Sequence, residues 1–276
     1  MTSLNLLASG KDIYRFMKGP PGWKVVGVDI NSLEPVVIAH FSQCPVYMSL
    51  YGPDAAPNQD AYIHLGCTIP KFADKFLEHY TPGNPTKEGV DYIKEHYDQE
   101  RFVCKVTFLS SVYGIHPPAL QASLANGGVQ MGIREVEEIH RGYWKTFSAV
   151  KKLEHKLQDE WRSNGGYIIT GRGTPKGLDQ KAASKDILSR FTQTTGHQYV
   201  MRWITHIDDI RKERGLSMRP LIKDMHDATY WCCPADEAEA TGEAIQDGLT
   251  RLNEELDLTV KFRGKTKIGD TLEVAK

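Results

Sequence analysis

The chain has 276 residues, of which 40 % are hydrophobic and 25 % are charged, an ordinary globular balance that argues against disorder. The formal net charge of −1 excludes a strongly basic, free-standing nucleic-acid binder, so any DNA contact must come from local patches or from another polypeptide. No apolar run approaches the roughly 18 residues that a membrane span needs, and no cleavable signal pattern is found. We therefore expect a cytoplasmic protein without a membrane partner.

The first predicted element is a strand at residues 23–29, which follows a turn-forming GPPG segment and ends on Asp29. Residues 32–41 predict a helix. Pro35 is compatible with it, because it falls in the first turn, where proline is tolerated. The proline-containing stretch 52–60 predicts a loop.

Residues 60–162 have a mostly helical pattern. One helix is predicted at 99–114, where a glycine ends it, and a long, charged, amphipathic helix is predicted at 133–161. Residues 165–177 change period and predict a β-hairpin or an extended loop, and residues 181–214 predict a further helix.

Two short strands are predicted within residues 221–233, with His226 and Asp227 at the bend between them. A helix at 235–255 and a final strand near 258–263 follow. This order predicts an α+β fold in which one sheet is interrupted by a long, mostly helical insertion. Such a sheet can bring together two acids that lie far apart in the sequence.

The chain contains five cysteines, an odd number with no CxxC pair, so neither a disulfide framework nor a zinc site has the spacing it needs. We expect buried free thiols in a reducing compartment. Cys232 and Cys233 are adjacent in a predicted strand and should alternate between core and surface.

Asp29 and Asp227 are the candidate metal-binding acids, because each is predicted at the end of a strand. Two metal ions roughly 3.5–4 Å apart can stabilise the attacking and leaving oxygens of a phosphoryl transfer, and they need carboxylates on rigid elements. A single aspartate at such a position is usually a turn former or a helix cap. The pair alone therefore indicates no more than a metal site to be tested.

Arg101, Lys105, Leu109 and Tyr113 recur every four residues in the helix predicted at 99–114. On an α-helix this spacing forms one nearly axial stripe. The two cations suit a triphosphate, and the apolar and aromatic positions could pack on a sugar or a base. The competing interpretation is a solvated basic face that continues into the core.

Five segments in this order resemble motifs of the A family of DNA polymerases, the bacterial polymerase I group with its many phage members. The segments are VDINSLEPVVIAHF, RFVCKVTFLSSVYG, GGYIITGRG, SRFTQTTG and DMHDATYW. The resemblance runs over nearly the whole chain. It implies a palm at residues 1–51 and 181–276, interrupted by helical fingers at 52–180.

The resemblance also implies the roles of the acids and cations. Asp29 and Asp227 would hold two Mg²⁺ ions, with the Ile30 carbonyl as a backbone ligand. Arg101 and Lys105 would bind the β- and γ-phosphates of a dNTP, and Lys105 would be a candidate general acid for the leaving group.

Further roles implied by the resemblance concern the nucleotide and the DNA. Glu34 would exclude the 2′-hydroxyl of a ribonucleotide, and Leu109 and Tyr62 would complete the dNTP site with Tyr113. The implied contacts to primer-template DNA are Gly114 and Tyr113 beside the templating base, His226 at the primer terminus, Arg190 and Gln193 in the minor groove, and Arg172 in the hairpin.

Four positions depart from the family pattern. Leu109 stands where the family usually has Phe or Tyr, and Val36 replaces an arginine. Ala228 replaces an auxiliary acid that normally follows the His-Asp pair. Tyr62 falls where many members have a histidine, and His64 could substitute only if the helix register shifted.

A thumb and a 3′–5′ exonuclease, which family members carry before the palm, are missing from this chain. Either the chain is an excised fragment, or the polymerase is split and a second polypeptide supplies the thumb, with or without the exonuclease; we favour the split. We expect a location in the host cytoplasm if the chain is phage-encoded. One alternative is a degenerate, non-catalytic subunit that binds DNA or scaffolds a replisome, which Val36 and Ala228 favour. Another is a single-subunit RNA polymerase, against which Glu34 argues.

Overall fold

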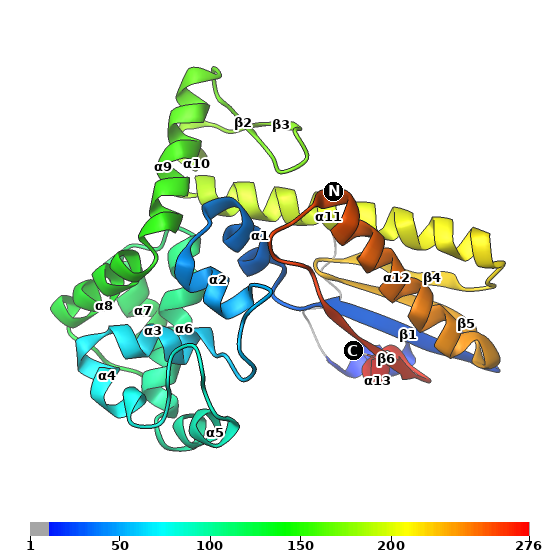
Figure 1. The fold of residues 1–276 in the computed structure, drawn as a ribbon, viewed down its shortest axis with the longest axis horizontal. Helices are drawn as coiled ribbons and strands as arrows, with labels where there is room; N and C mark the ends of the chain where they lie inside the picture. Colours follow the sequence, from blue (N-terminus) through cyan, green and yellow to red (C-terminus); the bar gives the residue numbers. More distant parts are fainter. Residues whose placement is uncertain (1–10, 276) are drawn as a thin grey trace. The chain divides into compact units, whose positions relative to one another are not determined.

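The computed structural model describes residues 11–275, and its Cα packing separates two compact units. The first, called the sheet unit, comprises the chain up to Leu33 together with the part from Thr195 onward. The second, called the helical unit, is Glu34–Thr194. Figure 1 shows the elements of both units, which are described separately. The assignment of palm to 1–51 and 181–276 and of fingers to 52–180 stays a prediction.

The sheet unit is built on a four-stranded antiparallel sheet in the order β4-β5-β1-β6. Strand β1 (Trp23–Ile30) is central and pairs with β5 (Ala228–Pro234) on one side and β6 (Gly264–Gly269) on the other. Strand β4 (Arg219–Met225) pairs with β5 at the edge. The predicted strands at 23–29 and within 221–233 are therefore confirmed.

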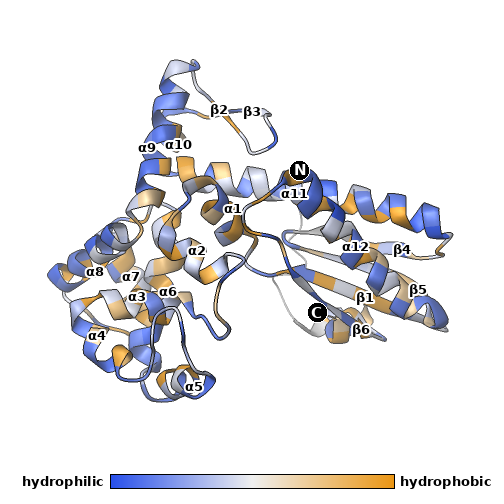
Figure 2. Cartoon of the chain, in the orientation of Figure 1, coloured by the Kyte–Doolittle hydropathy of each residue, from blue (hydrophilic) through white to orange (hydrophobic). Residues whose placement is uncertain are grey.

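Both faces of the sheet are covered, so β1 is a nearly continuous apolar run rather than an alternating one. Helix α12 (Ala238–Leu256) lies on one face, where Gly242 approaches Val26. On the other face, η1 (Lys11–Phe16) and α13 (Leu272–Ala275) supply Tyr14 and Leu272 to a buried cluster that also contains Val25 and Tyr230. Figure 2 shows the middle of β1 as hydrophobic.

The prediction that Cys232 and Cys233 alternate between core and surface is wrong. Cys232 is 6 % exposed and Cys233 is fully buried. The reason is that alternate side chains of β5 enter two different apolar layers, one on each face of the sheet. The expectation of free thiols is confirmed for all five cysteines, although Cys67 is only partly buried.

The final strand is shifted from the predicted position near 258–263 to Gly264–Gly269. The segment before it has buried apolar side chains, but its backbone is bound by the α12 residue Asn253. The Asn253 Oδ1 accepts from the Phe262 N–H at 2.8 Å, and its Nδ2 donates to the Phe262 carbonyl at 2.9 Å. A side chain thus replaces the strand partner that the β-rich composition suggested.

The helical unit consists of packed helices and one small hairpin, β2 (Tyr167–Ile169) with β3 (Pro175–Gly177). Helix α11 begins in this unit and continues into the sheet unit. The helix bounds are α1 Leu33–Ser42, α2 Pro45–Tyr51, α3 Ala61–Thr68, α4 Pro70–Leu77, α5 Lys87–His96, α6 Asp98–Val112, α7 Pro117–Asn126, α8 Ile133–Thr146, α9 Ser148–Ser163, α10 Gln180–Lys185 and α11 Ile187–Arg214.

Aromatic packing around α6 forms the core of the helical unit. Phe108 of α6 stacks on Tyr47 with ring centroids 5.6 Å apart, and Phe147 meets both rings edge-on. Tyr143 closes the cluster, and all four side chains are at most 2 % exposed. Because Phe108 is in the core, the opposite side of α6 is directed to the surface.

Two helices predicted as continuous are interrupted. The helix predicted at 133–161 is α8 followed by α9, and Phe147 between them leaves the helical conformation (φ −102°, ψ 40°). Its ring enters the aromatic core just described, which is a tertiary constraint that periodicity cannot reveal. The helix predicted at 181–214 breaks at Asp186 (φ −117°, ψ 11°), with no glycine or proline to signal the break.

Across residues 11–275, none of the helices combines the length and apolarity required to cross a bilayer. Helix α9 is mostly hydrophilic in Figure 2.

Candidate active site

Asp29 lies near the end of β1, and Asp227 lies in the turn directly before β5, the neighbouring strand of the sheet unit. Asp29 pairs with Ala228 in the β1–β5 register, and the Ile30 N–H donates to the Asp227 carbonyl at 2.8 Å. Backbone pairing therefore places the two aspartates one residue apart in register, although 198 positions separate them in the sequence. The structure thus brings together the two acids that sequence analysis selected.

The turn between β4 and β5 has an unusual backbone. His226 has φ +63°, in the left-handed region that non-glycine residues rarely occupy. The side chain of His226 is exposed, whereas Asp227 is half-buried. The left-handed residue reverses the chain in a short turn, so that Asp227 directly precedes the strand that pairs with β1.

The Tyr230 phenol lies close enough to sense both carboxylates. Tyr230 pairs with Gly27, two residues from Asp29 on the same face of the sheet. The pKa of Tyr230 is raised to about 12, first by burial and then by the negative charges of Asp29 and Asp227. Both acids thus contribute to the electrostatic environment of Tyr230.

A lysine that the sequence analysis did not place beside Asp29 lies next to this pair. Lys265 of β6 is directly opposite Asp29 in the β1–β6 register and is exposed. Opposed residues in an antiparallel pair share one face of the sheet. Since the strand was predicted too early in the chain, its register with Asp29 could not be foreseen.

The chemistry of the acid pair fits magnesium. Mg²⁺ is usually bound by one or two carboxylates, with water and substrate phosphates completing the octahedron. Asp29, Asp227 and the Ile30 carbonyl form such a minimal oxygen set. Among the residues that the structure describes, no group of three or more His, Cys, Asp or Glu side chains forms a denser metal site.

The predicted stripe on α6 lies at the surface of the helical unit. Lys105, Leu109 and Tyr113 are exposed, with Leu109 42 % and Tyr113 41 % accessible. The stripe does not continue into the core, which contradicts the core part of the competing interpretation, whereas the exposure agrees with its solvated face. Gly114 follows with φ +72°, which a glycine adopts without strain.

Arg101, the first residue of the stripe, is held by an acid that sequence analysis did not select. Asp60 Oδ2 lies 2.7 Å from Nη2 and 3.2 Å from Nε of Arg101. The Tyr62 ring centroid is 5.1 Å from the guanidinium carbon. Asp60 precedes a predicted helix and would have been noticed only as a helix cap.

Tyr62 and His64 occupy different environments on α3. Burial raises the pKa of the Tyr62 phenol, the Asp60 charge adds to this, and Arg101 opposes it. His64 is 9 % exposed, and burial lowers the pKa of its imidazole. Tyr62, and not His64, therefore lies against Arg101.

Glu34, Tyr113 and Gln193 form a polar cluster within the helical unit. The Tyr113 hydroxyl donates to the Glu34 carboxylate. The pKa of Tyr113 is raised to about 12, first by burial and then by Glu34, while a hydrogen bond from Gln193 opposes the rise. Three predicted site residues from α1, α6 and α11 therefore meet through their side chains.

The remaining predicted residues lie on two other elements. Arg190 is exposed one turn before Gln193 on α11. Arg172 is exposed at the turn between β2 and β3, on an element separate from the α6 stripe.

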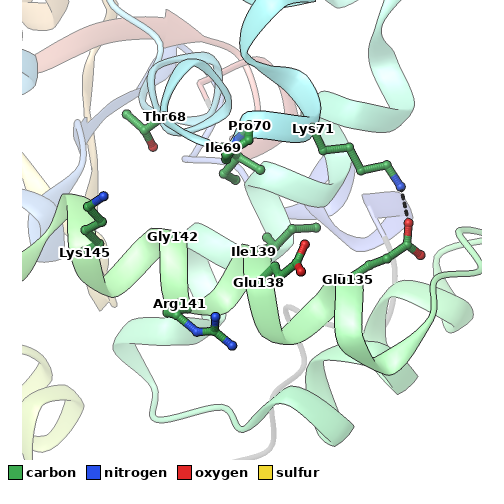
Figure 3. A pocket seen from close by; sticks show the side chains of 10 residues that line it. All are labelled: Thr68, Ile69, Pro70, Lys71, Glu135, Glu138, Ile139, Arg141, Gly142 and Lys145. Carbon is green, nitrogen blue, oxygen red and sulfur yellow. Dashed lines mark hydrogen bonds and ion pairs between the residues drawn. The ribbon is translucent and has the colours of Figure 1, made fainter.

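Two pockets in the helical unit differ in their relation to these residues. One, of about 480 Å³, is lined by Lys94, Arg101 and Lys105 among others. The other, of about 670 Å³, lies between the start of α4 and α8 and contains none of the predicted site residues. Figure 3 shows it with the Lys71–Glu135 ion pair at one side.

No protein-family model matches the sequence, and no curated protein matches it. Among solved structures, the chain is similar to the POL domain of Pol1 from M. smegmatis, determined in complex with DNA primer-template and dNTP. The TM-score is 0.75 at 16 % identity, over 96 % of this chain and 43 % of that chain. The predicted α+β fold is therefore confirmed, and it is similar to the fold of that POL domain. The chain spans less than half of the structure it matches.

Proposed function

We propose that this chain is the palm-and-fingers part of a template-directed DNA polymerase, which transfers a deoxynucleotide from a dNTP to a primer 3′-hydroxyl. The observation that carries the proposal is the proximity of the two aspartates along the backbone: Asp29 pairs with Ala228, and Asp227, the residue before it, accepts from the Ile30 N–H. The fold shared with a POL domain bound to primer-template and dNTP supports the same conclusion.

Asp29, Asp227 and the Ile30 carbonyl would hold two Mg²⁺ ions. When bound, these ions would lower the pKa of the primer hydroxyl and neutralise charge on the triphosphate. The primer oxygen forms a bond to the α-phosphorus of the dNTP, and the bond from that phosphorus to the pyrophosphate breaks. Pairing within a sheet suits the two acids to this role, because their separation is set by the backbone.

The helical unit would bind the nucleotide. Arg101 can offer its planar fork to the β- and γ-phosphates, and Lys105, one turn further on, a point charge. Lys105 would also donate a proton to the departing pyrophosphate. Glu34, fixed by the Tyr113 hydroxyl, would exclude a ribonucleotide by occupying the space of its 2′-hydroxyl.

Leu109, Tyr113 and Tyr62 would complete the dNTP site. The DNA would be contacted by residues of both units. The proposed primer-template contacts are Gly114, Arg172, Arg190, Gln193 and His226. A second polypeptide would supply the thumb and also a 3′–5′ exonuclease. The near-neutral charge of this chain supports that division, because duplex affinity depends on phosphate contacts.

Primer extension tests the proposal. We expect Mg²⁺-dependent incorporation of dNTPs in preference to rNTPs, weak with this chain alone and strong when a thumb-bearing chain is added. Preference for rNTPs would instead support an RNA polymerase. Robust processive synthesis by this chain alone would contradict the need for a partner.

A catalytically degenerate, DNA-binding or scaffolding subunit is the second candidate. The observation that favours it is Ala228, a 3 % exposed residue of the apolar cluster at the position beside Asp29. Asp227→Ala distinguishes the two candidates. A polymerase loses incorporation with this variant, whereas unchanged activity of the assembled complex would identify a scaffold.

A further inference from the structure

The two carboxylate oxygens of Asp60 accept hydrogen bonds from different groups. Its Oδ1 accepts from the Tyr62 and Ile63 N–H groups at 3.0 and 3.1 Å, which caps the start of α3. Its Oδ2 accepts from Nε and Nη2 of Arg101. One side chain therefore joins the beginning of α3 to the guanidinium on α6.

From this geometry we propose that Asp60 is a positioning residue, which orients Arg101 for a nucleoside triphosphate without touching the nucleotide. The proposal rests on the phosphate-binding role of Arg101 in the proposed function. It adds a residue that neither the sequence pattern nor the likeness to a solved structure assigned.

The arrangement leaves Arg101 able to bind phosphate. A guanidinium has five N–H donors, and Asp60 engages two of them, at Nε and Nη2, which leaves three for other acceptors. The Tyr62 ring lies against the same guanidinium, so the guanidinium plane is restrained by a second contact. A side chain ordered in advance loses less rotamer entropy when a ligand binds.

The fold also opposes displacement of Asp60 by the ligand. Its side chain is only 10 % exposed, and turning it away from Arg101 would uncap α3. Helix α3 is itself closely packed, since Gly66 lies against Cys104 of α6 and Phe76 of α4. The carboxylate is thus fixed by the fold, and the guanidinium is fixed by the carboxylate.

The Asp60→Asn substitution separates the α3 cap from the bond to Arg101. Asparagine is as good an N-cap as aspartate, but it has a single acceptor oxygen. The variant can cap α3 or bind Arg101, and it carries no charge to hold the cation. Asp60→Ala removes both the α3 cap and the bond to Arg101, so it should have the lower melting temperature of the two variants. That difference would show that the cap survives in Asp60→Asn.

The test is a double-mutant cycle on the full chain, with binding of dATP and of inorganic tripolyphosphate measured in Mg²⁺. We expect Asp60→Asn to raise both dissociation constants by about tenfold, the size of one or two charge-assisted hydrogen bonds. In an Arg101→Ala background, Asp60→Asn should have no further effect, because Asp60 acts through Arg101. Asp74→Asn, an exposed acid on α4, is the matched control.

Additive effects in the cycle would overturn the proposal, since a purely structural cap would act independently of Arg101. Tighter binding by Asp60→Asn would also overturn it, because Asp60 would then compete with phosphate for Arg101. Failure of the wild-type chain to bind either probe would have the same consequence. Binding without primer extension under any condition would defeat the polymerase proposal while leaving the role of Asp60 intact.

Discussion

The sheet unit and the helical unit position their candidate residues by different means. In the sheet unit, Asp29 and Asp227 are placed by backbone hydrogen bonds between adjacent strands. In the helical unit, Glu34 meets Tyr113 through a side-chain hydrogen bond, and Arg101 meets Asp60 in the same way.

The difference has a consequence for mutation. Backbone pairing does not depend on which side chain a strand carries, so an aspartate in the sheet unit can be replaced without moving its neighbour. A residue fixed by a side-chain bond loses its position when its partner is truncated. Substitution of an aspartate in the sheet unit should therefore remove only the function of its carboxylate. Substitution in the helical unit should also displace the hydrogen-bonded side chain beside it.

The largest expected effect is that of Asp29→Asn. Incorporation should fall on the order of a thousandfold, because one of two metal-binding carboxylates becomes neutral. The unfolding transition should be nearly unchanged, since the β1–β5 register is a backbone property. Primer extension and thermal melting measure the two outcomes. Asp236→Asn, an exposed acid in the same unit, is the control and should retain full activity.

A smaller effect is expected for Glu34→Ala in the helical unit. Ribonucleotide incorporation relative to deoxyribonucleotide incorporation should rise by roughly a hundredfold, because the group that excludes the 2′-hydroxyl is removed. Competition between dNTP and rNTP on one primer measures this ratio. Glu88→Ala removes another first-turn glutamate, on α5, and should leave the ratio unchanged. An equal change in both variants would mean that Glu34 acts only through general electrostatics.

A weaker version of the same change should follow from Tyr113→Phe, which removes only the hydroxyl that holds Glu34. A hydrogen bond to a carboxylate contributes about 1.5 kcal/mol, so discrimination against rNTPs should fall by about tenfold. Tyr92→Phe, a similarly exposed tyrosine on α5, is the control. If Tyr113→Phe left discrimination intact while Glu34→Ala abolished it, Glu34 would not depend on its side-chain partner, and the contrast between the units would fail.

The same contrast explains how much of the molecule could be predicted from sequence. The strand ending on Asp29 and the bend at Asp227 are marked by local composition, and their proximity follows once both strands share a sheet. The α6 stripe follows from helical periodicity. These features depend on short-range patterns, which a single sequence contains.

The features that sequence analysis missed depend on tertiary contacts. The break at Phe147 reflects entry of its ring into the aromatic core, and the late start of β6 reflects the bonds from Asn253 to Phe262. Because β6 was misplaced, Lys265 was not expected beside Asp29. Asp60 and Arg101 are 41 positions apart, and nothing in either local pattern marks them as partners.

The smallest expected effect concerns the Tyr230 phenol, which tests whether the two acids share one electrostatic environment. The pKa of Tyr230, about 12, should fall when either acid is neutralised, and more with Asp29→Asn than with Asp227→Asn, because Asp29 contributes more. Tyrosine-ring NMR during an alkaline titration measures it, with Asp236→Asn as the control.

The sign of the effect on stability follows from linkage. The folded pKa lies above the ordinary value of about 10, so the stabilising contribution of the phenol is complete below roughly pH 10. It is lost as the pH rises through about 12. Neutralising Asp29 should lower the folded pKa, so this alkaline loss of stability should become smaller and end at a lower pH. A Tyr230 titration that neither substitution changes would show that the carboxylates do not act on a common point, and the two-carboxylate magnesium site would lose its electrostatic support.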